Sequence, residues 1–323
     1  MVFRVSAGQA DKTGSSIANG RHGARSRRRN RSKYSYSQPR TIPYFDFNIC
    51  WVTKNTETYV PSGAQLMANN QRFLNFLDRH QGAAPIMPAV HTTSVTRLGE
   101  IINNDEIKLT ECRFYKKDLS YFFYGKPAYK LGNHSGAASK QLGDAGVCFV
   151  FDLGTLPTIY KSFALDTGAC FGKRYDEYLP MGVGIDDFGL PADQAYLAKV
   201  VAAFYGGNRS YFVGDGRHDV APPGLDVASQ AYADIARSVV SLQFDDRACT
   251  CEIQLDQPVA LANARLLTVV MPDKAFDDPE VKIALGRWDV RPVLYRMKRA
   301  RPGERTEVIH EKLGDFYELS GLI

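Results

Sequence analysis

Short apolar segments separated by polar breaks run along most of this chain, and they predict strands and helices in a mixed order. Strands are expected where β-branched and aromatic residues dominate, at 44–52, 89–93, 119–124, 147–153, 247–255 and 266–271. Helices are expected where apolar residues recur three or four positions apart, over about 61–77, 94–104, 197–205 and 227–239. This order predicts an α+β fold.

Four other regions have weaker patterns. Residues 132–146, 161–189 and 208–224 are polar or rich in glycine and turn residues, so we expect loops there, the second of them a long excursion over the surface. Near the C-terminus, residues 293–297 and 307–310 are expected to form a hairpin or neighbouring strands before a short last helix.

The segment from Leu119 to Lys130 is the most unusual of the predicted strands. Two tyrosines lie in its run of aromatic residues before a Gly-Lys-Pro break, and a buried phenol needs a hydrogen-bond partner. Alternation puts Tyr121 and Phe123 on one face and Phe122 and Tyr124 on the other. Two interpretations stay open: a core strand with amphipathic ends, or rings that stack on a flat ligand.

The composition is that of a globular protein, since 44% of the 323 residues are hydrophobic, enough for a substantial core. No apolar run approaches the roughly 18 residues that span a bilayer, and the N-terminus lacks the apolar core of a secretory signal. We therefore expect no membrane segment. The six cysteines form no CxxC pair, which favours free thiols and a cytoplasmic protein.

The net charge of +5 hides an asymmetry. Residues 1–40 hold ten Lys or Arg and one acid, whereas residues 41–323 hold 30 basic and 34 acidic residues. We expect residues 1–42 to be a disordered basic arm and residues 43–323 to be the folded domain. Such an arm, with Tyr34 and Tyr36 interleaved, suits a nucleic-acid contact. A solubilising tail and an organellar transit peptide are the alternatives.

A glutamate lies in the middle of the strand predicted at 247–255. Alternation places the cysteine and apolar side chains of this strand on one face, and Thr250, Glu252 and Gln254 on the other. A solvated outer face, which antiparallel sheets often have, is the simple explanation of Glu252.

Three features occur in order along the chain: His91-Thr92 at the end of a strand, the aromatic strand and turn Tyr121–Tyr129, and Glu252 on a later strand. The set resembles the ADP-ribosyltransferase superfamily, above all its DarT-like branch of bacterial toxins and phage-defence proteins. The resemblance covers residues 89–130 and 245–272. It implies an ADP-ribosyltransferase-like split β-sandwich, with flanking helices and an NAD cleft between two packed sheets.

The resemblance also implies roles for individual residues. Glu252 would be the catalytic carboxylate that stabilises the oxocarbenium ion formed as nicotinamide leaves, because preorganised charge favours a transition state. His91 would hold a ribose hydroxyl. Tyr121 or Tyr124 would pack against nicotinamide, and Tyr124 is favoured because it adjoins the turn, so that the implied catalytic set is Glu252, His91 and Tyr124.

The implied NAD-binding residues are His91, Thr92, Tyr121, Tyr124, Lys126 and Tyr129. Lys126 would meet phosphate, although this branch often has Arg at that position and Lys cannot make the bidentate contact.

The expected activity is the transfer of ADP-ribose from NAD, as a substrate, to a macromolecule, with release of nicotinamide and without a metal ion. The basic arm favours nucleic acid as the acceptor, and a protein acceptor is the alternative. The resemblance implies a toxin or anti-phage effector, with an antitoxin protein as a candidate partner. NAD hydrolysis and removal of a 2′-phosphate from RNA are neighbouring activities in the superfamily.

Two functions of other classes remain open. A basic-armed nucleic-acid-binding protein with a catalytically inactive fold would share every feature except a need for Glu252. Residues 165–169 are also similar to the Asp-Thr-Gly-Ala turn of aspartic proteases, in which Asp166 would need a second carboxylate from another copy of the chain. A tight turn with Asp166 bonded to its own backbone is the simpler interpretation.

Overall fold

The computed structural model describes residues 63–128, 138–238 and 249–323. The predicted arm at 1–42, the predicted strand at 44–52 and Tyr129 lie outside these residues. The strands are β1 Ala89–Ser94, β2 Glu106–Ile107, β3 Thr110–Cys112, β4 Lys117–Tyr124, β5 Gly146–Phe151, β6 Lys161–Phe163, β7 Gly189–Leu190, β8 Glu252–Leu255, β9 Val259–Ala260, β10 Leu266–Pro272 and β11 Pro292–Tyr295.

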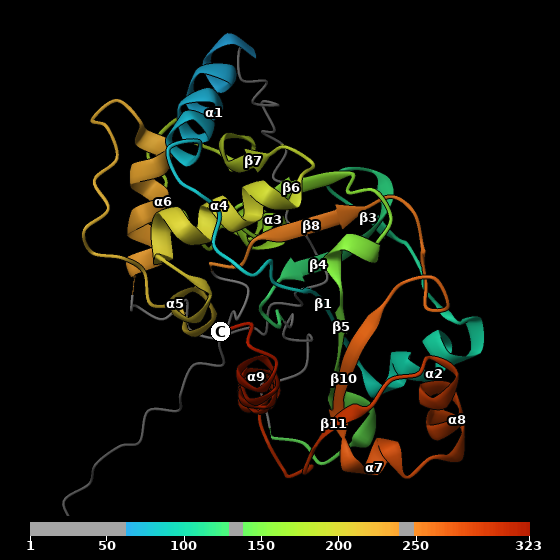
Figure 1. The fold of residues 1–323 in the computed structure, drawn as a ribbon. Helices are drawn as coiled ribbons and strands as arrows, with labels where there is room; N and C mark the ends of the chain where they lie inside the picture. Colours follow the sequence, from blue (N-terminus) through green and yellow to red (C-terminus); the bar gives the residue numbers. More distant parts are fainter. Residues whose placement is uncertain (1–62, 129–137, 239–248) are drawn as a thin grey trace, which may run out of the picture. The chain divides into compact units, whose positions relative to one another are not determined.

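Nine of these strands form one connected sheet in the order β11-β10-β5-β1-β4-β8-β6-β7, with β3 beside β4 (Figure 1). All pairs are antiparallel except β10 and β11, and β2 and β9 form a separate pair. The predicted α+β class is confirmed. The sheet differs from the expected pair of packed sheets in that its two halves stay joined at β1 and β4.

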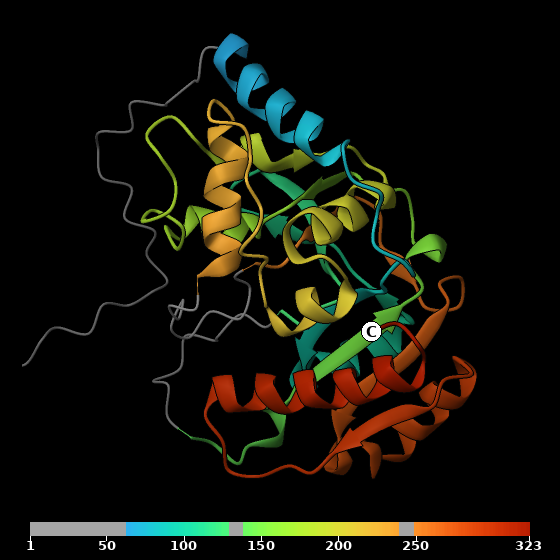
Figure 2. The ribbon, with the colours of Figure 1, turned by 60° about the vertical axis from the view of Figure 1, so that its left-hand side comes forward.

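The helices of the described residues lie on both sides of this sheet. They are α1 Gly63–Leu77, α2 Val95–Asn104, α3 Thr167–Phe171, α4 Gln194–Tyr205, α5 Asn208–Val213, α6 Val227–Arg237, α7 Asp273–Phe276, α8 Pro279–Arg287 and α9 Pro302–Leu319. Helices α1, α4 and α6 pack together beside the β4–β8 half, and α2, α7 and α8 gather beside β10 (Figures 1 and 2). Helix α9 packs against β5, β10 and β11.

The core lies where these helices meet the sheet. Strand β5 is buried at all six positions because elements cover both of its faces, which explains its continuous apolar sequence. On α1, Phe73 is fully buried and its ring lies 5.5 to 6.0 Å from the rings of Phe188, Phe204 and Tyr232. Burial of such rings is the main source of stability in a fold of this size.

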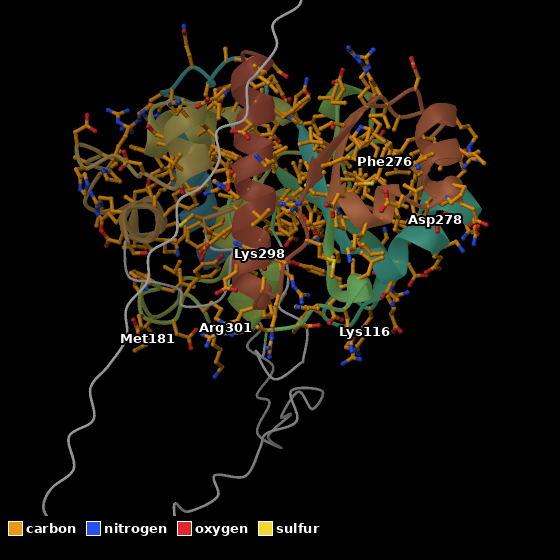
Figure 3. The ribbon with its side chains drawn as sticks, turned by 90° about the horizontal axis from the view of Figure 1, so that it is seen from below. Lys116, Met181, Phe276, Asp278, Lys298 and Arg301 are labelled. Atoms are coloured by element: carbon orange, nitrogen blue, oxygen red, sulfur yellow. The ribbon has the colours of Figure 1, made fainter. Side chains whose placement is uncertain are left out.

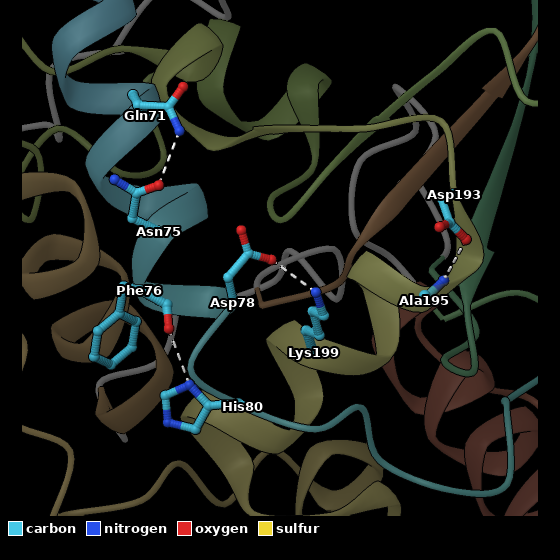
Figure 4. Close-up of polar contacts among 8 residues, drawn as sticks. All are labelled: Gln71, Asn75, Phe76, Asp78, His80, Asp193, Ala195 and Lys199. Carbon is cyan, nitrogen blue, oxygen red and sulfur yellow. Dashed lines mark hydrogen bonds and ion pairs between the residues drawn. The ribbon is translucent and has the colours of Figure 1, made fainter.

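Capping residues explain where several helices begin. Asp278 accepts a hydrogen bond from the Glu280 amide at 2.8 Å, and Pro279 occupies the first helical position of α8. Figure 3 labels Asp278 near Phe276, at the junction of α7 and α8. Asp193 caps α4 in the same way, by accepting from the Ala195 amide at 2.9 Å (Figure 4).

A second set of polar contacts joins α1 to α4 (Figure 4). The Lys199 ammonium on α4 donates to Asp78, just after α1, at 2.7 Å. The His80 ring contacts the Phe76 carbonyl through Nδ1 at 3.1 Å. These contacts fix the chain reversal at the end of α1.

Four expectations from the sequence are wrong. Residues 293–297 and 307–310 form no hairpin, because β11 runs parallel to β10 and residues 307–310 lie inside the 18-residue helix α9. The region 208–224 contains helix α5, and the region 161–189 supplies the sheet strands β6 and β7. In the segment predicted at 247–255, β8 begins only at Glu252, and Cys249 has a left-handed backbone with φ of 60°.

The junction between the two halves of the sheet is short. Strand β1 pairs with β5 at all six positions, but with β4 only at Ala89 and Val90. Beyond Val90 the two strands part, and the His91 ring bridges them through a 2.9 Å contact of Nδ1 with the Tyr121 carbonyl. A side chain therefore replaces the backbone ladder at the centre of the sheet.

Candidate functional site

Glu252 occupies the first position of β8, between β4 and β6. It lies directly opposite Phe123 on one side and Phe163 on the other, so all three side chains share one face of the sheet. Only 1% of Glu252 is exposed. The simple explanation, that Glu252 lies on a solvated outer face, is therefore wrong. Its side chain instead has an aromatic residue as its neighbour on each adjacent strand.

Three donors contact this buried carboxyl group. The Thr167 amide donates to Oε2 at 3.0 Å and the Thr167 hydroxyl donates to Oε1 at 2.8 Å. The Gln254 side-chain amide also donates to Oε1, at 2.6 Å. Both carboxyl oxygens therefore accept hydrogen bonds from the protein itself. Thr167 donates from the turn before α3, and Gln254 donates from β8.

Burial, and after it the neighbouring Asp166 carboxylate, raise the pKa of Glu252 to about 8, although the hydrogen bonds from Gln254 and Thr167 act to lower it. In the orientation described above, Gln254 Oε1 is buried without a hydrogen-bond partner among the described residues.

Asp166 and Thr167 belong to the turn that resembles an aspartic-protease motif. Asp166 is the N-cap of α3, and its side chain accepts from the Ala169 amide. Asp166 is buried, and the carboxyl group that senses its charge is Glu252 of the same chain. This geometry agrees with the simpler interpretation of the motif as a tight turn with Asp166 bonded to its own backbone.

Tyr121 is the tyrosine that shares a face with the glutamate. It lies opposite Gln254, two positions along β4 from Phe123, as the alternation predicts. Its side chain is half-buried, and burial is the main cause of its raised pKa, followed by Cys112 and Glu252. The influence of Glu252 on both Tyr121 and Tyr115 indicates that these two phenols lie near the carboxyl group.

Tyr124 points to the opposite face and is fully buried. Its hydroxyl accepts from the Met87 amide at 3.0 Å, and its carbonyl accepts from the Tyr211 hydroxyl at 2.9 Å. Tyr124 is therefore a core residue, and the preference for it as the nicotinamide-stacking ring does not fit the structure. Proximity to the turn was the wrong criterion, because strand period decides which ring meets Glu252.

His91 and Thr92 point to opposite sides of β1. The His91 ring lies 5.2 Å from the Phe122 ring, and burial lowers its pKa, so the ring is neutral with Nδ1 donating to the Tyr121 carbonyl. No hydrogen bond joins His91 to Glu252, and the His91 ring packs on Phe122, whose side chain is on the face of β4 opposite to Tyr121. Thr92 lies opposite Cys148 on β5, and its hydroxyl is buried without a hydrogen bond to any described oxygen or nitrogen.

Lys126 forms no ion pair with Glu252. Only 8% of it is exposed, its ammonium is 4.9 Å from the centre of the Tyr211 ring, and burial lowers its pKa, an effect that the nearby Cys249 and Cys251 oppose. The Tyr211 hydroxyl accepts from the Cys251 amide at 3.1 Å, so this lysine lies just beyond the end of the β4–β8 pair at which Glu252 begins β8. Its ammonium packs on the Tyr211 ring there and does not meet the carboxyl group.

An aromatic and basic surface, which the sequence analysis missed, lies next to this site. The rings of Phe114 and Phe171 stack with centroids 4.1 Å apart and planes within 8°, although 51% and 39% of these residues are exposed. We call this surface the aromatic surface; its members are Phe114, Tyr115, Lys117, Tyr160, Lys161 and Phe171. The run Arg-Phe-Tyr-Lys-Lys at 113–117, which mixes aromatic and basic residues, could have indicated this surface from the sequence.

Two lysines belong to the aromatic surface through their contacts with tyrosine rings. The Lys117 ammonium lies 3.6 Å from the centre of the Tyr160 ring, and the Lys161 ammonium lies 4.9 Å from that of Tyr115. Lys161 is directly opposite Gln254, two pairs along from Glu252 and on the same face. The aromatic surface thus extends from the solvent to the neighbours of the buried carboxyl group.

Chemically, this arrangement offers a carboxyl group of raised pKa beside aromatic rings. Within residues 63–128, 138–238 and 249–323, no group of three or more His, Cys, Asp or Glu side chains is placed to hold a metal ion. None of the helices in the same residues combines the length and apolar composition needed to span a bilayer. No protein-family model, curated protein or solved structure matches this chain.

Proposed function

We propose that this chain is an NAD-dependent ADP-ribosyltransferase that releases nicotinamide and transfers ADP-ribose to a macromolecule, with nucleic acid as the favoured acceptor. The observation that carries the proposal is Glu252: a buried glutamate with a raised pKa, on the strand next to the aromatic strand β4. Burying a carboxyl group costs free energy that an apolar residue would not, so a chemical role explains its presence better than packing.

The three elements that support the resemblance are neighbours in the sheet. Strand β1 carries His91, β4 carries Tyr121, and β8 carries Glu252, in that order. In the proposed reaction the Glu252 carboxylate binds a hydroxyl of the nicotinamide ribose and stabilises the positive charge that develops as the C–N bond to nicotinamide breaks. Tyr121 replaces Tyr124 as the ring that packs against nicotinamide.

His91 has two roles in this proposal. Its Nδ1 proton holds the Tyr121 carbonyl where β1 and β4 part, which fixes the backbone of the stacking residue. Its Nε2 atom is then the acceptor available for a ribose hydroxyl. Thr92 and Lys126 have no part in the proposal, because Thr92 lies opposite Cys148 on β5 and the Lys126 ammonium packs on the Tyr211 ring.

The carboxyl group must become accessible before NAD can reach it. Thr167 contacts both of its oxygens, and the segment that follows, from Phe171 to Arg174, is exposed. The proposal therefore requires the turn at Asp166–Phe171 to move outward, so that ribose hydroxyls replace Thr167 as the donors to Glu252. Hydrogen-bond exchange of this kind leaves both oxygens satisfied throughout.

The aromatic surface supports nucleic acid as the acceptor. Exposed rings that stack on each other offer a face on which bases stack. Lys161 is the cation beside them that would attract phosphate, since Lys117 is already paired with Asp256 at 2.8 Å. Phe114 and Phe171 have this exposure, and Phe171 ends the helix whose first residue binds Glu252. A base stacked there would lie beside the turn that must move.

A second candidate is a nucleic-acid-binding protein without catalytic activity. The 1% exposure of Glu252 and its three internal hydrogen bonds favour it, because such a carboxyl group can serve structure alone. The aromatic surface and the basic residues 1–42 suit either function. Cleavage of NAD separates the two.

The test is incubation of the full-length protein with NAD labelled in its adenylate part, together with RNA, DNA and protein fractions. We expect label to become attached to a nucleic-acid fraction, and Phe114→Ala/Phe171→Ala to reduce that transfer at least about tenfold, the loss of stacking on two rings. Leu225→Ala/Leu319→Ala, which shortens two exposed apolar residues elsewhere, is the control. Label on protein alone would contradict the favoured acceptor.

The resemblance also carries a biological proposal. An enzyme that consumes NAD to modify nucleic acid would act as a toxin or anti-phage effector in the cytoplasm, and an antitoxin protein would be its natural partner. Growth arrest on expression, relieved by Glu252→Gln, is the expected phenotype. Arrest that persists in the variant would separate toxicity from the proposed chemistry.

A further inference from the structure

The segment between β11 and α9 contains an unusual concentration of positive charge. Residues 290–303 include five Arg or Lys and no Asp or Glu. Four of these cations are exposed and lie between the end of β11 and the start of α9. We call them the basic loop: Arg296, Lys298, Arg299 and Arg301. Figure 3 labels Lys298 and Arg301 near the start of α9.

The cations of the basic loop have no counterions within the part of the chain that the structure describes. Among residues 63–128, 138–238 and 249–323, no carboxylate forms an ion pair with any of the four. Two carboxylates that contact the loop bind its backbone instead, since Asp273 accepts from the Met297 amide at 3.3 Å and Glu304 accepts from the Arg301 amide at 2.8 Å. The positive charge is therefore available to a partner.

The loop that carries these cations is held in place. Ala300 exchanges two backbone hydrogen bonds with Ser139, at 3.0 and 3.2 Å, and Ala300 and Tyr295 are buried. Arg305 on α9 donates to the Asp144 carbonyl at 2.6 Å and to the Ser139 carbonyl at 3.0 Å. A partner thus meets side chains on a fixed backbone, which lowers the entropy cost of binding.

The surroundings favour a polyanion lying on the surface. The hollow beside the basic loop measures about 10 Å³, which is room for one water molecule and no small-molecule ligand. Leu294 is the only exposed large apolar residue between 290 and 309, so the loop has no apolar face that could enter a bilayer. Three of the four cations are arginines, whose planar donors match phosphate.

We propose that the basic loop is a binding site for the phosphodiester backbone of a nucleic acid. The inference rests on the proposed function for the identity of the polyanion, because a nucleic-acid acceptor must also be held by its backbone while one base reaches the aromatic surface. The contacts to phosphate are independent of sequence and weaken with salt, since binding releases counterions.

The test measures binding in the absence of NAD, so its outcome is independent of catalysis. Full-length protein is titrated into a labelled single-stranded oligonucleotide, and into the corresponding duplex, at several salt concentrations. In Arg296→Gln/Lys298→Gln/Arg299→Gln/Arg301→Gln we expect the slope of log K against log salt for the single strand to fall by about 2 to 3, at about 0.7 for each phosphate that the variant no longer neutralises.

A matched control removes the same charge elsewhere. Arg97, Arg209, Arg265 and Lys312 are three arginines and one lysine that form surface ion pairs with Glu100, Glu318, Asp152 and Asp315. Their joint replacement by Gln is expected to change the slope by less than about 1, because these cations already have counterions. Equal thermal unfolding of the two variants verifies that both are folded.

Equal slopes in the two quadruple variants would overturn the proposal, as would wild-type protein that binds neither oligonucleotide. Binding of the wild type to vesicles of anionic lipid, with no binding to nucleic acid, would assign the basic loop to a membrane surface and would also overturn it. Wild-type protein that binds the oligonucleotide but releases no nicotinamide from NAD would contradict the proposed function. The proposal that the basic loop binds nucleic acid would still stand.

Discussion

At the scale of single residues, Glu252 ties the stability of the protein to pH. Its pKa in the folded protein is raised from 4.5 to about 8, first by burial and then by Asp166. The folded state therefore holds its proton more tightly than the unfolded chain does. This contribution to stability is fully present below pH 4.5 and is lost as the pH rises towards 8.

Glu252→Gln, which imitates the protonated side chain, removes this dependence. We expect the variant to be more stable than the wild type at a pH above 8 by at least about 1 kcal/mol, and the two proteins to converge at acid pH, since each pKa unit corresponds to about 1.4 kcal/mol. Urea unfolding at a series of pH values measures this. Parallel curves for the two proteins would show that Glu252 does not titrate in this range.

The two tyrosines of β4 give a second residue-scale prediction. Tyr124→Phe leaves the buried Met87 amide without its acceptor and should cost about 1 to 3 kcal/mol of stability. Tyr121→Phe should cost less than about 1 kcal/mol, because that side chain is half-buried, whereas Tyr121→Ala should reduce nicotinamide release by raising KM for NAD. The opposite ranking would return the stacking role to Tyr124.

At the scale of elements, the turn at Asp166–Phe171 adjusts the pKa of Glu252, whose largest shift comes from burial. If the ionised carboxylate drives nicotinamide release, the rate rises with pH through the pKa of Glu252. Asp166→Asn keeps the helix cap but removes the neighbouring negative charge, so the rise should move to lower pH. The pH profile of kcat/KM at saturating acceptor measures the shift.

Thr167→Val should move the same profile in the opposite direction. The substitution removes the hydroxyl that donates to Oε1 and keeps the volume of the side chain, so the ionised carboxylate loses a hydrogen bond. Thr167→Ser restores the donor and should restore the profile. Shifts of equal sign in Asp166→Asn and Thr167→Val would contradict the electrostatic account of this turn.

The sequence predicted correctly those helices and strands whose apolar residues recur with a clear helical or strand periodicity. Strands β1, β4, β5 and β10 and helices α1, α2, α4 and α6 lie where apolar period and turn residues place them. Helix α9 was predicted only as a short last helix, with residues 307–310 assigned to a strand, because its buried residues, Thr306, Ile309, Leu313 and Tyr317, lie among many charged ones. Strands β6 and β7 are two or three residues long, and only pairing with β8 and with each other makes them strands.

The candidate site was predictable in part. Alternation along β4 and β8 correctly divided the rings and placed Glu252 and Gln254 on one face. The partners of the carboxyl group were not predictable, since Thr167 is 85 positions away and reaches Glu252 only through the fold. The burial of Lys126 beside Tyr211 has the same cause, because the aromatic neighbour comes from helix α5.

At the scale of the whole molecule, the short β1–β4 junction divides the sheet into two halves, and Glu252 lies in the half that also carries the aromatic surface. The basic loop follows β11, at the end of the other half. A nucleic acid that met both would have to reach from one half to the other. Binding that involves both surfaces should therefore depend on the length of the oligonucleotide.

The strongly basic residues 1–40 add a third positive region. We expect their deletion to weaken oligonucleotide binding and to lower its salt dependence, while nicotinamide release in the absence of acceptor stays unchanged, since no residue of the proposed site lies in that segment. Anisotropy titrations across salt concentrations measure the first effect. Undiminished, equally salt-sensitive binding would assign these residues the role of a solubilising tail.

The central claim is that Glu252 drives the departure of nicotinamide from NAD, and the release of labelled nicotinamide from NAD by purified full-length protein tests it most directly. We predict release by the wild type that increases as the pH rises through about 8 and falls at least about a hundredfold in Glu252→Gln, a folded variant that lacks the charge. Release that is absent in the wild type, or equal in the two proteins, would contradict the account.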